Sequence, residues 1–322
     1  MCAPRYGSRM KIAVVIEGQM NLSYAQQLAA AQRAERVGID GFFRTDHYES
    51  FPGPDDQATT DAWSVLAGLA RETSRITLGT LVSPVTFRAP GEYAKVVATV
   101  QEMAGRRIHA GLGTGWHESE HRRHGFPFPE MPVRAEMLEE QLEIVRSLWS
   151  GPDGWRFDGA HYTVADTRFR PKPEPTPWVI TGGEGSPRGM RIAARFSDEF
   201  NLTSSTPALA REKFAQLDAV CVAAGRAPSS LARSAMTGAM IGRTEGDYLE
   251  KIRAFMSRIG AAGDPEEYLA PRRARWLVGT PDQALTQMRA FRDSGADRLM
   301  IQHMEPTETA TIDLLAELHA QL

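Results

Sequence analysis

Residues 11–43, KIAVVIEGQMNLSYAQQLAAAQRAERVGIDGFF, predict a strand, a helix and a second strand in succession. The run 11–16 is rich in β-branched residues, which favour strands. Ser23 and Gln26 then have the spacing of a capping box, in which each side chain bonds a free N–H at the start of a helix. Apolar residues follow at helical spacing until Gly38, a typical helix stop. The next strand is expected at 41–44.

The same strand–helix unit recurs along the chain without an intervening linker. A proline often occupies the first position of the expected helices, where its missing N–H costs nothing. Eight strands with helices between them predict the α/β class and a single (β/α)8 TIM barrel over residues 11–322, after a tail of residues 1–10. An open doubly wound sheet in two domains is the alternative. Further strands are expected at 76–82, 107–112, 178–181, 199–202, 234–241 and 298–302, with insertions at 114–132 and 150–177.

The composition excludes several classes of protein. Lysine and arginine number 37 against 40 acidic residues, a net charge of −3 that offers no basic surplus for nucleic acid. No run of about 18 apolar residues predicts a membrane span, and the first residues lack the apolar region of a secretory signal. Cys2 and Cys221 are the only cysteines, which favours a reducing, cytoplasmic location and excludes a disulfide scaffold.

In a barrel of this kind the chemistry is expected on the loops that follow the strands. Asp46 and His47 follow the second strand, where a histidine can donate or accept a proton near neutral pH. The alternative is a solvated loop histidine that bonds only its neighbour. The segment 111–116, Gly-Leu-Gly-Thr-Gly-Trp, follows the fourth strand, and its glycines allow a ring or phosphate to approach the backbone. Its spacing matches the dinucleotide fingerprint only weakly.

A second glycine-rich segment follows the fifth strand. Gly182, Gly183 and Gly185 lead into Ser186-Pro187, which has the form of a helix start. Unpaired N–H groups at such an N-terminus favour an anion, so the segment predicts a phosphate site to which Arg188 or Arg191 adds charge. A simple turn between strand and helix is the alternative.

Taken together, the order and spacing of these strings resemble the luciferase-like monooxygenase superfamily and, within it, the coenzyme F-420-dependent oxidoreductases. The resemblance extends from residue 11 to about residue 305. The matching strings are Asp46-His47, Thr73-Ser74-Arg75-Ile76-Thr77-Leu78-Gly79-Thr80, Arg88 with Pro90, Gly113-Thr114-Gly115-Trp116 with Glu120 and Gly125-Phe126-Pro127, Pro171-Lys172-Pro173, Gly182-Gly183 and Val278-Gly279-Thr280-Pro281.

The resemblance implies a barrel that binds a flavin or a deazaflavin at its C-terminal mouth. The ring is expected against a bulge in the third strand, where a cis peptide bond would join Leu81 and Val82, and the phosphate against Gly182 and Gly183. The resemblance also implies a homodimer. The residues expected to bind the cofactor are Asp46, His47, Leu81, Val82, Ser83, Gly113, Gly115, Gly182, Gly183 and Gly185.

One position departs from the pattern of the glucose-6-phosphate dehydrogenases in this family. They carry a glutamate after the Gly-Thr-Gly, where this chain has Trp116. The difference argues against sugar-phosphate oxidation and indicates an apolar substrate pocket shaped by Phe51 and Trp116. The nearby acids Glu118 and Glu120 are expected to face elsewhere.

The leading hypothesis is a redox enzyme that transfers hydride between coenzyme F-420 and a small organic substrate. His47, oriented by Asp46, would donate or accept the accompanying proton. The alternative is an FMN-dependent monooxygenase that uses oxygen and receives reduced flavin from a separate reductase. A barrel that binds a ligand without catalysis is a third hypothesis. A serine hydrolase is disfavoured because no Gly-x-Ser-x-Gly elbow occurs.

Histidines at 117, 121 and 124 would share one face of a helix, and two histidines four residues apart can bind zinc. No further ligand cluster is evident, so a polar helix in the insertion is preferred and no metal is expected. Cys221 lies among apolar residues at helical spacing and is interpreted as a packed side chain.

Overall fold

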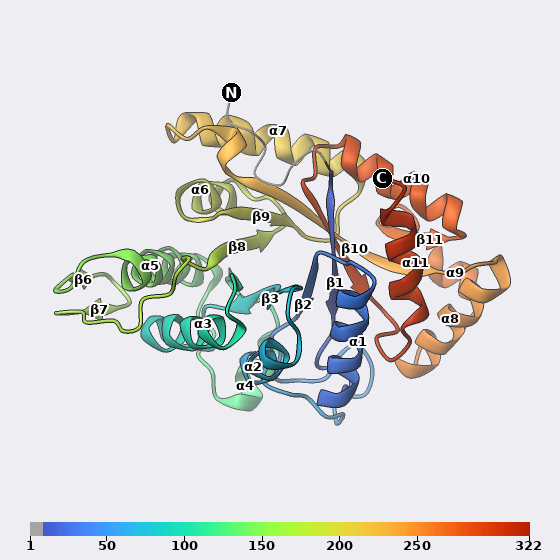
Figure 1. The fold of residues 1–322 in the computed structure, drawn as a ribbon, viewed down its shortest axis with the longest axis horizontal. Coiled ribbons are helices and arrows are strands. Elements are labelled where there is room, and N and C mark those ends of the chain that lie inside the picture. The colour runs from blue at the N-terminus through green and yellow to red at the C-terminus, as the bar shows by residue number, and fades with distance from the viewer. Residues whose placement is uncertain (1–8) are drawn as a thin grey trace.

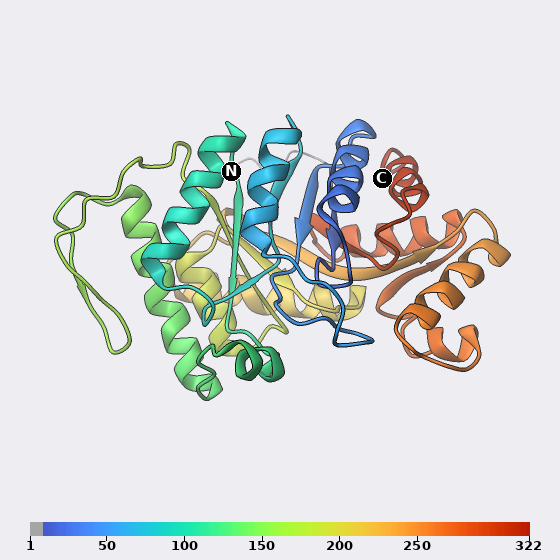
Figure 2. The same ribbon diagram turned by 90° about the horizontal axis from the view of Figure 1, so that it is seen from below.

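Eight parallel strands close into a ring, with helices arranged around it (Figure 1 and Figure 2). The computed structural model describes residues 9–322; Cys2 and most of the expected tail lie outside the described residues. Each strand pairs with the next along the chain, and β10 closes the ring by pairing with both β9 and β12. The predicted (β/α)8 barrel is confirmed. Its strands are β1 (Lys11–Ile16), β2 (Gly41–Arg44), β3 (Thr77–Thr80), β5 (His109–Gly113), β8 (Trp178–Gly183), β9 (Glu199–Leu202), β10 (Ala232–Ile241) and β12 (Arg298–His303).

The helices begin where the sequence predicts. The capping box of Ser23 and Gln26 is present at the start of the first helix, and proline lies in the first turn of six other α-helices, among them Pro90 in α3. Helix α5 begins at Met131, inside the insertion expected over 114–132, because Pro132 is tolerated in a first turn. The outer helices are α1 (Tyr24–Arg36), α2 (Ala62–Glu72), α3 (Pro90–Ala104), α5 (Met131–Ser150), α6 (Pro187–Phe196), α7 (Pro207–Ala223), α10 (Pro281–Asp293) and α11 (Ala310–His319).

A further strand and two further helices lie between β10 and α10. They are α8 (Glu245–Arg258), α9 (Pro265–Leu269) and β11 (Trp276–Gly279). Strand β11 pairs with Gly238–Ile241 of β10. The first half of the same edge of β10 pairs with β9. The sequence patterns predict neither α9 nor β11. A four-residue strand is too short to show periodicity, and only the unusual length of β10 provides its partner.

The third strand is interrupted, as the family resemblance implies. It ends at Thr80, and the peptide bond between Leu81 and Val82 is cis. A two-residue strand, β4 (Ser83–Pro84), then pairs with β5. The expected continuous strand over 76–82 is therefore divided by a bulge at the mouth of the barrel.

The insertions contain short elements of their own. The first holds helix α4 (Glu118–His124). The second holds the expected hairpin, β6 (Phe157–Asp158) with β7 (Thr163–Val164), which projects away from the barrel (Figure 1). A single 3-10 turn, η1 (Pro228–Ser230), precedes β10.

The core has two layers because side chains alternate along each strand. On β1, Ile12 and Val14 pack toward the helices, whereas Ala13 and Val15 belong to the cluster inside the barrel. Cys221 is buried in the outer layer, as predicted, and burial raises the pKa of its thiol. Among the described residues, no helix is both long enough and apolar enough to cross a membrane.

A substitution at Gly111 tests how closely β5 packs against the end of β3 and the bulge at Val82. A Cβ at this position would overlap the carbonyl oxygen of Thr80 and lie 2.9 Å from Val82. We expect Gly111→Ala to lower the free energy of unfolding by about 2 kcal/mol or more, because backbone of a neighbouring strand has to move. Chemical denaturation measures the change. The control is Gly91→Ala in α3, where a Cβ meets nothing and the helix gains stability; equal effects of the two substitutions would refute the argument.

Candidate active site

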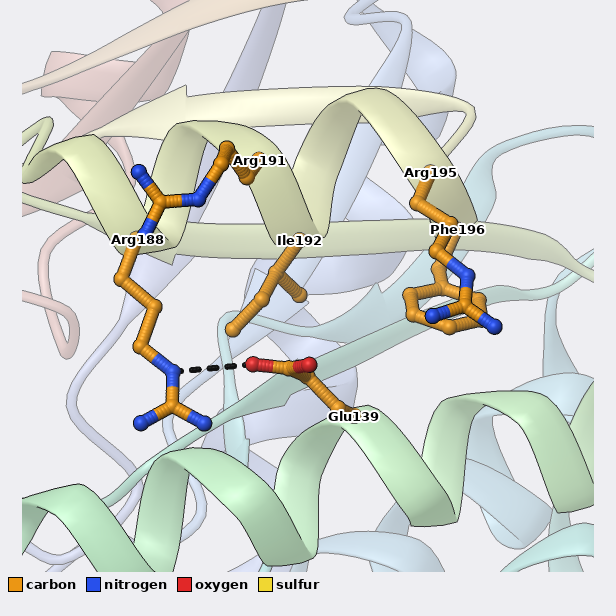
Figure 3. A pocket seen from close by; sticks show the side chains of 6 residues that line it. All are labelled: Glu139, Arg188, Arg191, Ile192, Arg195 and Phe196. Carbon is orange, nitrogen blue, oxygen red and sulfur yellow. Dashed lines mark hydrogen bonds and ion pairs between the residues drawn. The ribbon is translucent and has the colours of Figure 1, made fainter. Parts of the chain in front are cut away.

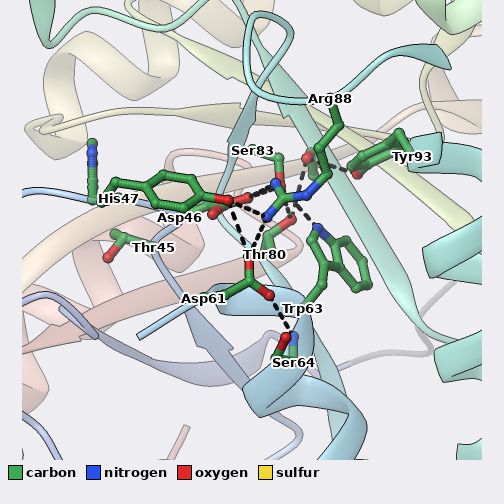
Figure 4. Close-up of polar contacts among 12 residues, drawn as sticks. Thr45, Asp46, His47, Asp61, Trp63, Ser64, Thr80, Ser83, Arg88 and Tyr93 are labelled. Carbon is green, nitrogen blue, oxygen red and sulfur yellow. Dashed lines mark hydrogen bonds and ion pairs between the residues drawn. The ribbon is translucent and has the colours of Figure 1, made fainter. Parts of the chain in front are cut away.

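The predicted site residues gather at the carboxyl ends of β2, β3 and β5, the mouth of the barrel. Asp46 and His47 follow β2 directly, and the cis bond before Val82 follows β3. Asp46 is buried and so is Arg88, which comes from the segment before α3. Figure 4 shows these groups converging from separate segments of the chain.

Arg88 joins the segment after β2 to helix α2. Its guanidinium lies 2.6 Å from Asp46 Oδ2 and 2.6 Å from Asp61 Oδ2, and Ser83 Oγ also donates to Asp46 Oδ2 at 2.6 Å. Burial of Arg88 acts to lower its pKa, but the two carboxylates outweigh burial and raise it. Asp46 Oδ1 is buried without a hydrogen-bond partner among the described residues. Asp46 therefore keeps one acceptor available at the mouth.

His47 points away from Asp46, so the expectation that Asp46 orients it is wrong (Figure 4). Its Nδ1 lies 2.9 Å from Oε1 of Glu120, on α4. The physical reason is that Arg88 and Ser83 bind the carboxylate of Asp46, whereas the imidazole of His47 meets the carboxylate of Glu120. The expectation that Glu120 faces elsewhere is also wrong. Its side chain is fully buried, and its second oxygen accepts the backbone N–H of Tyr48 at 2.9 Å.

The bonds to Glu120 keep its carboxyl group ionised. Burial acts to raise its pKa, but the hydrogen bond with His47 and the N–H of Tyr48 outweigh burial and lower the pKa below the ordinary value of 4.5. The side chain is therefore a carboxylate at neutral pH. Helix α4 thus brings a negative charge against His47.

Two aromatic side chains, Phe51 and Trp116, flank His47. The ring of Phe51 lies 4.6 Å from the imidazole centroid and that of Trp116 lies 5.8 Å from it, both edge-on. Phe51 and Trp116 also contact each other, with centroids 5.4 Å apart. Trp116 is 65% exposed, so part of this aromatic pair is open to solvent.

A glycine of β5 makes room for Val82. A Cβ at Gly113 would lie 2.7 Å from the Val82 side chain, whereas one at Gly182 of β8 would lie 3.6 Å from it, an ordinary contact. Gly183 has open space on its side-chain position. Gly115 adopts a φ of 74°, which favours glycine, in the turn that leads to α4. Gly113 therefore accommodates the bulge at Val82, and Gly183 leaves the neighbouring surface open.

Helix α6 begins after the second glycine segment, and its cap is confirmed. Ser186 Oγ accepts the N–H of Gly189. The expected charge contribution of Arg188 is wrong, because its guanidinium turns to Glu139 of α5, 2.8 Å away. Arg188 and Arg191 both line a surface pocket of about 480 Å³ beside α5, with Glu139, Ile192, Arg195 and Phe196 (Figure 3). The ion pair therefore directs the charge of Arg188 to α5, while the phosphate site itself and a contribution from Arg191 stay predictions.

The histidines of the α4 segment make separate contacts. His121 is buried, with Nε2 2.6 Å from Thr86 Oγ1 and Nδ1 2.7 Å from the carbonyl oxygen of His117. His117 approaches Glu49, and His124 stacks on Phe126. No group of three or more histidine, cysteine, aspartate or glutamate side chains in residues 9–322 is arranged to hold a metal ion.

The model of the luciferase-like monooxygenase family matches residues 10–298. The chain belongs to this family. Among its relatives, an F-420-dependent glucose-6-phosphate dehydrogenase of Microbacterium testaceum is 34% identical over 182 residues, which are 56% of this chain and 53% of that protein. The chain thus spans about half the length of that relative. The pyrimidine monooxygenase RutA of Stutzerimonas stutzeri is 28% identical over 293 residues, 89% of this chain and 74% of RutA.

A solved structure shares the fold of this luciferase-like protein. It is an F-420-dependent secondary alcohol dehydrogenase in complex with an F-420–acetone adduct, with a TM-score of 0.82 and 20% identity. The match covers 97% of this chain and 98% of that one. At this identity the likeness shows the luciferase-like barrel alone.

Sequence reasoning missed the partners that hold the site of this luciferase-like barrel together. Arg88 stood in the matched strings without a role, Glu120 was expected to face elsewhere, and Asp61 was not singled out. Spacing within α4 does not distinguish Glu120 from the exposed Glu118, since each is next to a histidine in the chain. Only the packing of α4 against the segment after β2 selects one of them.

Arg88→Met tests the ion pair that anchors the site of this luciferase-like protein. The variant leaves Asp46 buried without its cation, so we expect the free energy of unfolding to fall by about 3–5 kcal/mol. Denaturant titration measures the loss. The control is Arg243→Met, which removes an exposed pair with Glu317 and changes stability far less. A loss at Arg88 no larger than at Arg243 would contradict the assignment.

Proposed function

We propose that this protein is an oxidoreductase that transfers hydride between coenzyme F-420 and a small organic substrate, with His47 as the proton donor or acceptor. The observation that carries the proposal is the placement of His47 at the barrel mouth, held by a buried carboxylate and flanked by an open aromatic wall. The relative from Microbacterium, which is named for F-420, supports the choice of cofactor.

The mouth has features that fit a deazaflavin. Asp46 Oδ1 is a buried acceptor without a partner in residues 9–322, and Gly183 leaves its surroundings open. When bound, the deazaflavin would supply a ring carbon that exchanges hydride with the substrate. We propose that it is held by Asp46, His47, Leu81, Val82, Ser83, Gly113, Gly115, Gly182, Gly183 and Gly185.

The chain's own residues would position the substrate and manage its proton. His47 would take the proton of a hydroxyl group in oxidation or return it to a carbonyl oxygen in reduction. Phe51 and Trp116 would hold an apolar part of the substrate and exclude water. The contact between His47 and Trp116 supports a substrate without a sugar phosphate, since an indole replaces a charged group there. We also propose that residues 11–322 are one domain and that the protein is a cytoplasmic homodimer.

An FMN-dependent monooxygenase is the second candidate. The similarity to RutA, a pyrimidine monooxygenase that this chain matches over 89% of its length, supports it. This candidate needs reduced flavin, which a separate reductase would supply, and oxygen. The same mouth residues would then hold FMN in place of the deazaflavin.

A titration of the purified protein with each cofactor separates the two candidates. We expect F-420 to bind with a Kd at least about tenfold lower than that of FMN, a difference of about 1.4 kcal/mol. Quenching of cofactor fluorescence measures both constants. Tighter binding of FMN would reject the F-420 proposal. If the protein only binds a ligand, no candidate substrate will change the absorbance of bound F-420.

His47→Ala tests the proton role. We expect kcat to fall by about 100- to 10,000-fold, the usual contribution of a positioned acid or base, whereas the Kd of the cofactor changes little. Steady-state assays and the fluorescence titration measure the two quantities. His161→Ala is the control, because His161 pairs with Glu136 beside the distant hairpin. Unchanged turnover in His47→Ala would remove its assigned role.

A further inference from the structure

We propose that Glu120 is a positioning residue that determines which nitrogen of His47 carries a proton. The inference rests on the proposed function, since it describes how the same histidine is prepared for proton transfer. It assigns a role to the insertion between β5 and α5. It also replaces the Asp46–His47 partnership that the sequence suggests.

The geometry of Glu120 leaves its carboxylate two defined partners. One oxygen lies 2.9 Å from His47 Nδ1, and the other accepts the N–H of Tyr48 at 2.9 Å. The carboxylate is fully buried, and its lowered pKa keeps it charged at neutral pH. A carboxylate can only accept hydrogen bonds, so Nδ1 of His47 has to be the donor.

The tautomer of His47 follows from this bond. With the proton on Nδ1, the neutral imidazole presents Nε2 as a bare acceptor. In oxidation Nε2 would take the hydroxyl proton of the substrate while hydride passes from the adjacent carbon to bound F-420; in reduction, with hydride supplied by the reduced cofactor, the imidazolium would return that proton to the carbonyl oxygen. The buried carboxylate stabilises the positive charge on His47 in either direction.

The helix that carries Glu120 is fastened to the segment that carries His47. Ser119 Oγ donates to Glu49 Oε1 at 3.1 Å, and Arg123 contacts both Glu49 and Asp55. On the other side of α4, His121 bonds Thr86. These contacts hold α4 in register with the segment after β2. The distance from Glu120 to His47 is therefore set by several independent bonds.

Glu120→Gln is the decisive variant because it retains the size of the side chain and removes one acceptor. The N–H of Tyr48 cannot change its role, so the amide oxygen is expected to stay on Tyr48 and the amide nitrogen to face His47. That nitrogen donates, which requires an unprotonated Nδ1 and transfers the proton to Nε2. The variant should therefore present a donor at the mouth in place of an acceptor.

Nitrogen NMR of the ¹⁵N-histidine-labelled protein reads the tautomer directly, without cofactor or substrate. His47→Asn identifies the His47 signals, and alkaline pH keeps the ring neutral. We expect a protonated Nδ1 in the wild type and in Glu120→Asp, which retains the charge, and a protonated Nε2 in Glu120→Gln. A protonated Nε2 in the wild type, or no change in Glu120→Gln, would overturn the inference. The wild-type spectrum decides even if Glu120→Gln does not fold.

Turnover gives the second readout. We expect Glu120→Gln to lower kcat by about 10- to 100-fold with little change in KM, and Glu120→Asp to recover part of this loss. Glu118→Gln is the matched control, since Glu118 is exposed on the same helix. If F-420 fails to bind while the tautomer is as expected, the proposed function fails and the positioning role stands. If His47→Ala is inactive but Glu120→Gln turns over like the wild type, the positioning role fails alone.

Discussion

The buried ion pair between Arg88 and Asp46 holds the mouth of this barrel together. Removing two charges from water costs several kcal/mol for each ion, so such a pair is stable only when further hydrogen bonds satisfy it. Ser83 and Asp61 provide these bonds, which connects the bulge after β3 and the start of α2 to the segment after β2. The position of His47 depends on this connection, because the ion pair with Arg88 fixes Asp46, the residue that precedes His47 in the chain.

The two sides of the segment after β2 perform different tasks. Asp46 faces inward to the ion pair, and His47 faces α4, where Glu120 meets it. An insertion that looks like a polar surface helix in the sequence therefore provides a buried carboxylate to the mouth. The aromatic wall of Phe51 and Trp116 closes against the same histidine. The ion pair, the histidine with its carboxylate partner, and the aromatic wall thus combine segments that are far apart in the chain.

Elements with strong local signals could be predicted from the sequence, whereas partnerships between side chains could not. The start of α1 was predictable because Ser23 and Gln26 satisfy their own helix, and β1 because its apolar run is buried on both faces. Strand β11 could not be predicted because four residues are too few to show an alternation of side chains. Only its pairing with β10 defines it as a strand. The sequence suggested a phosphate contact for Arg188 because this residue closely follows the glycines in the chain. Its pairing with Glu139 of α5 is a tertiary contact that the sequence does not indicate.

The sequence by itself determined the barrel, the family resemblance, and the cluster of candidate residues at the strand ends. These features rest on short-range patterns: alternation along strands, helix caps, and glycine where the backbone turns. The tertiary structure alone decided that His47 pairs with Glu120 and that Asp46 pairs with Arg88. The reason is physical, because burial forces each charged group to find a partner, and which partner lies within about 3 Å depends on how distant segments pack.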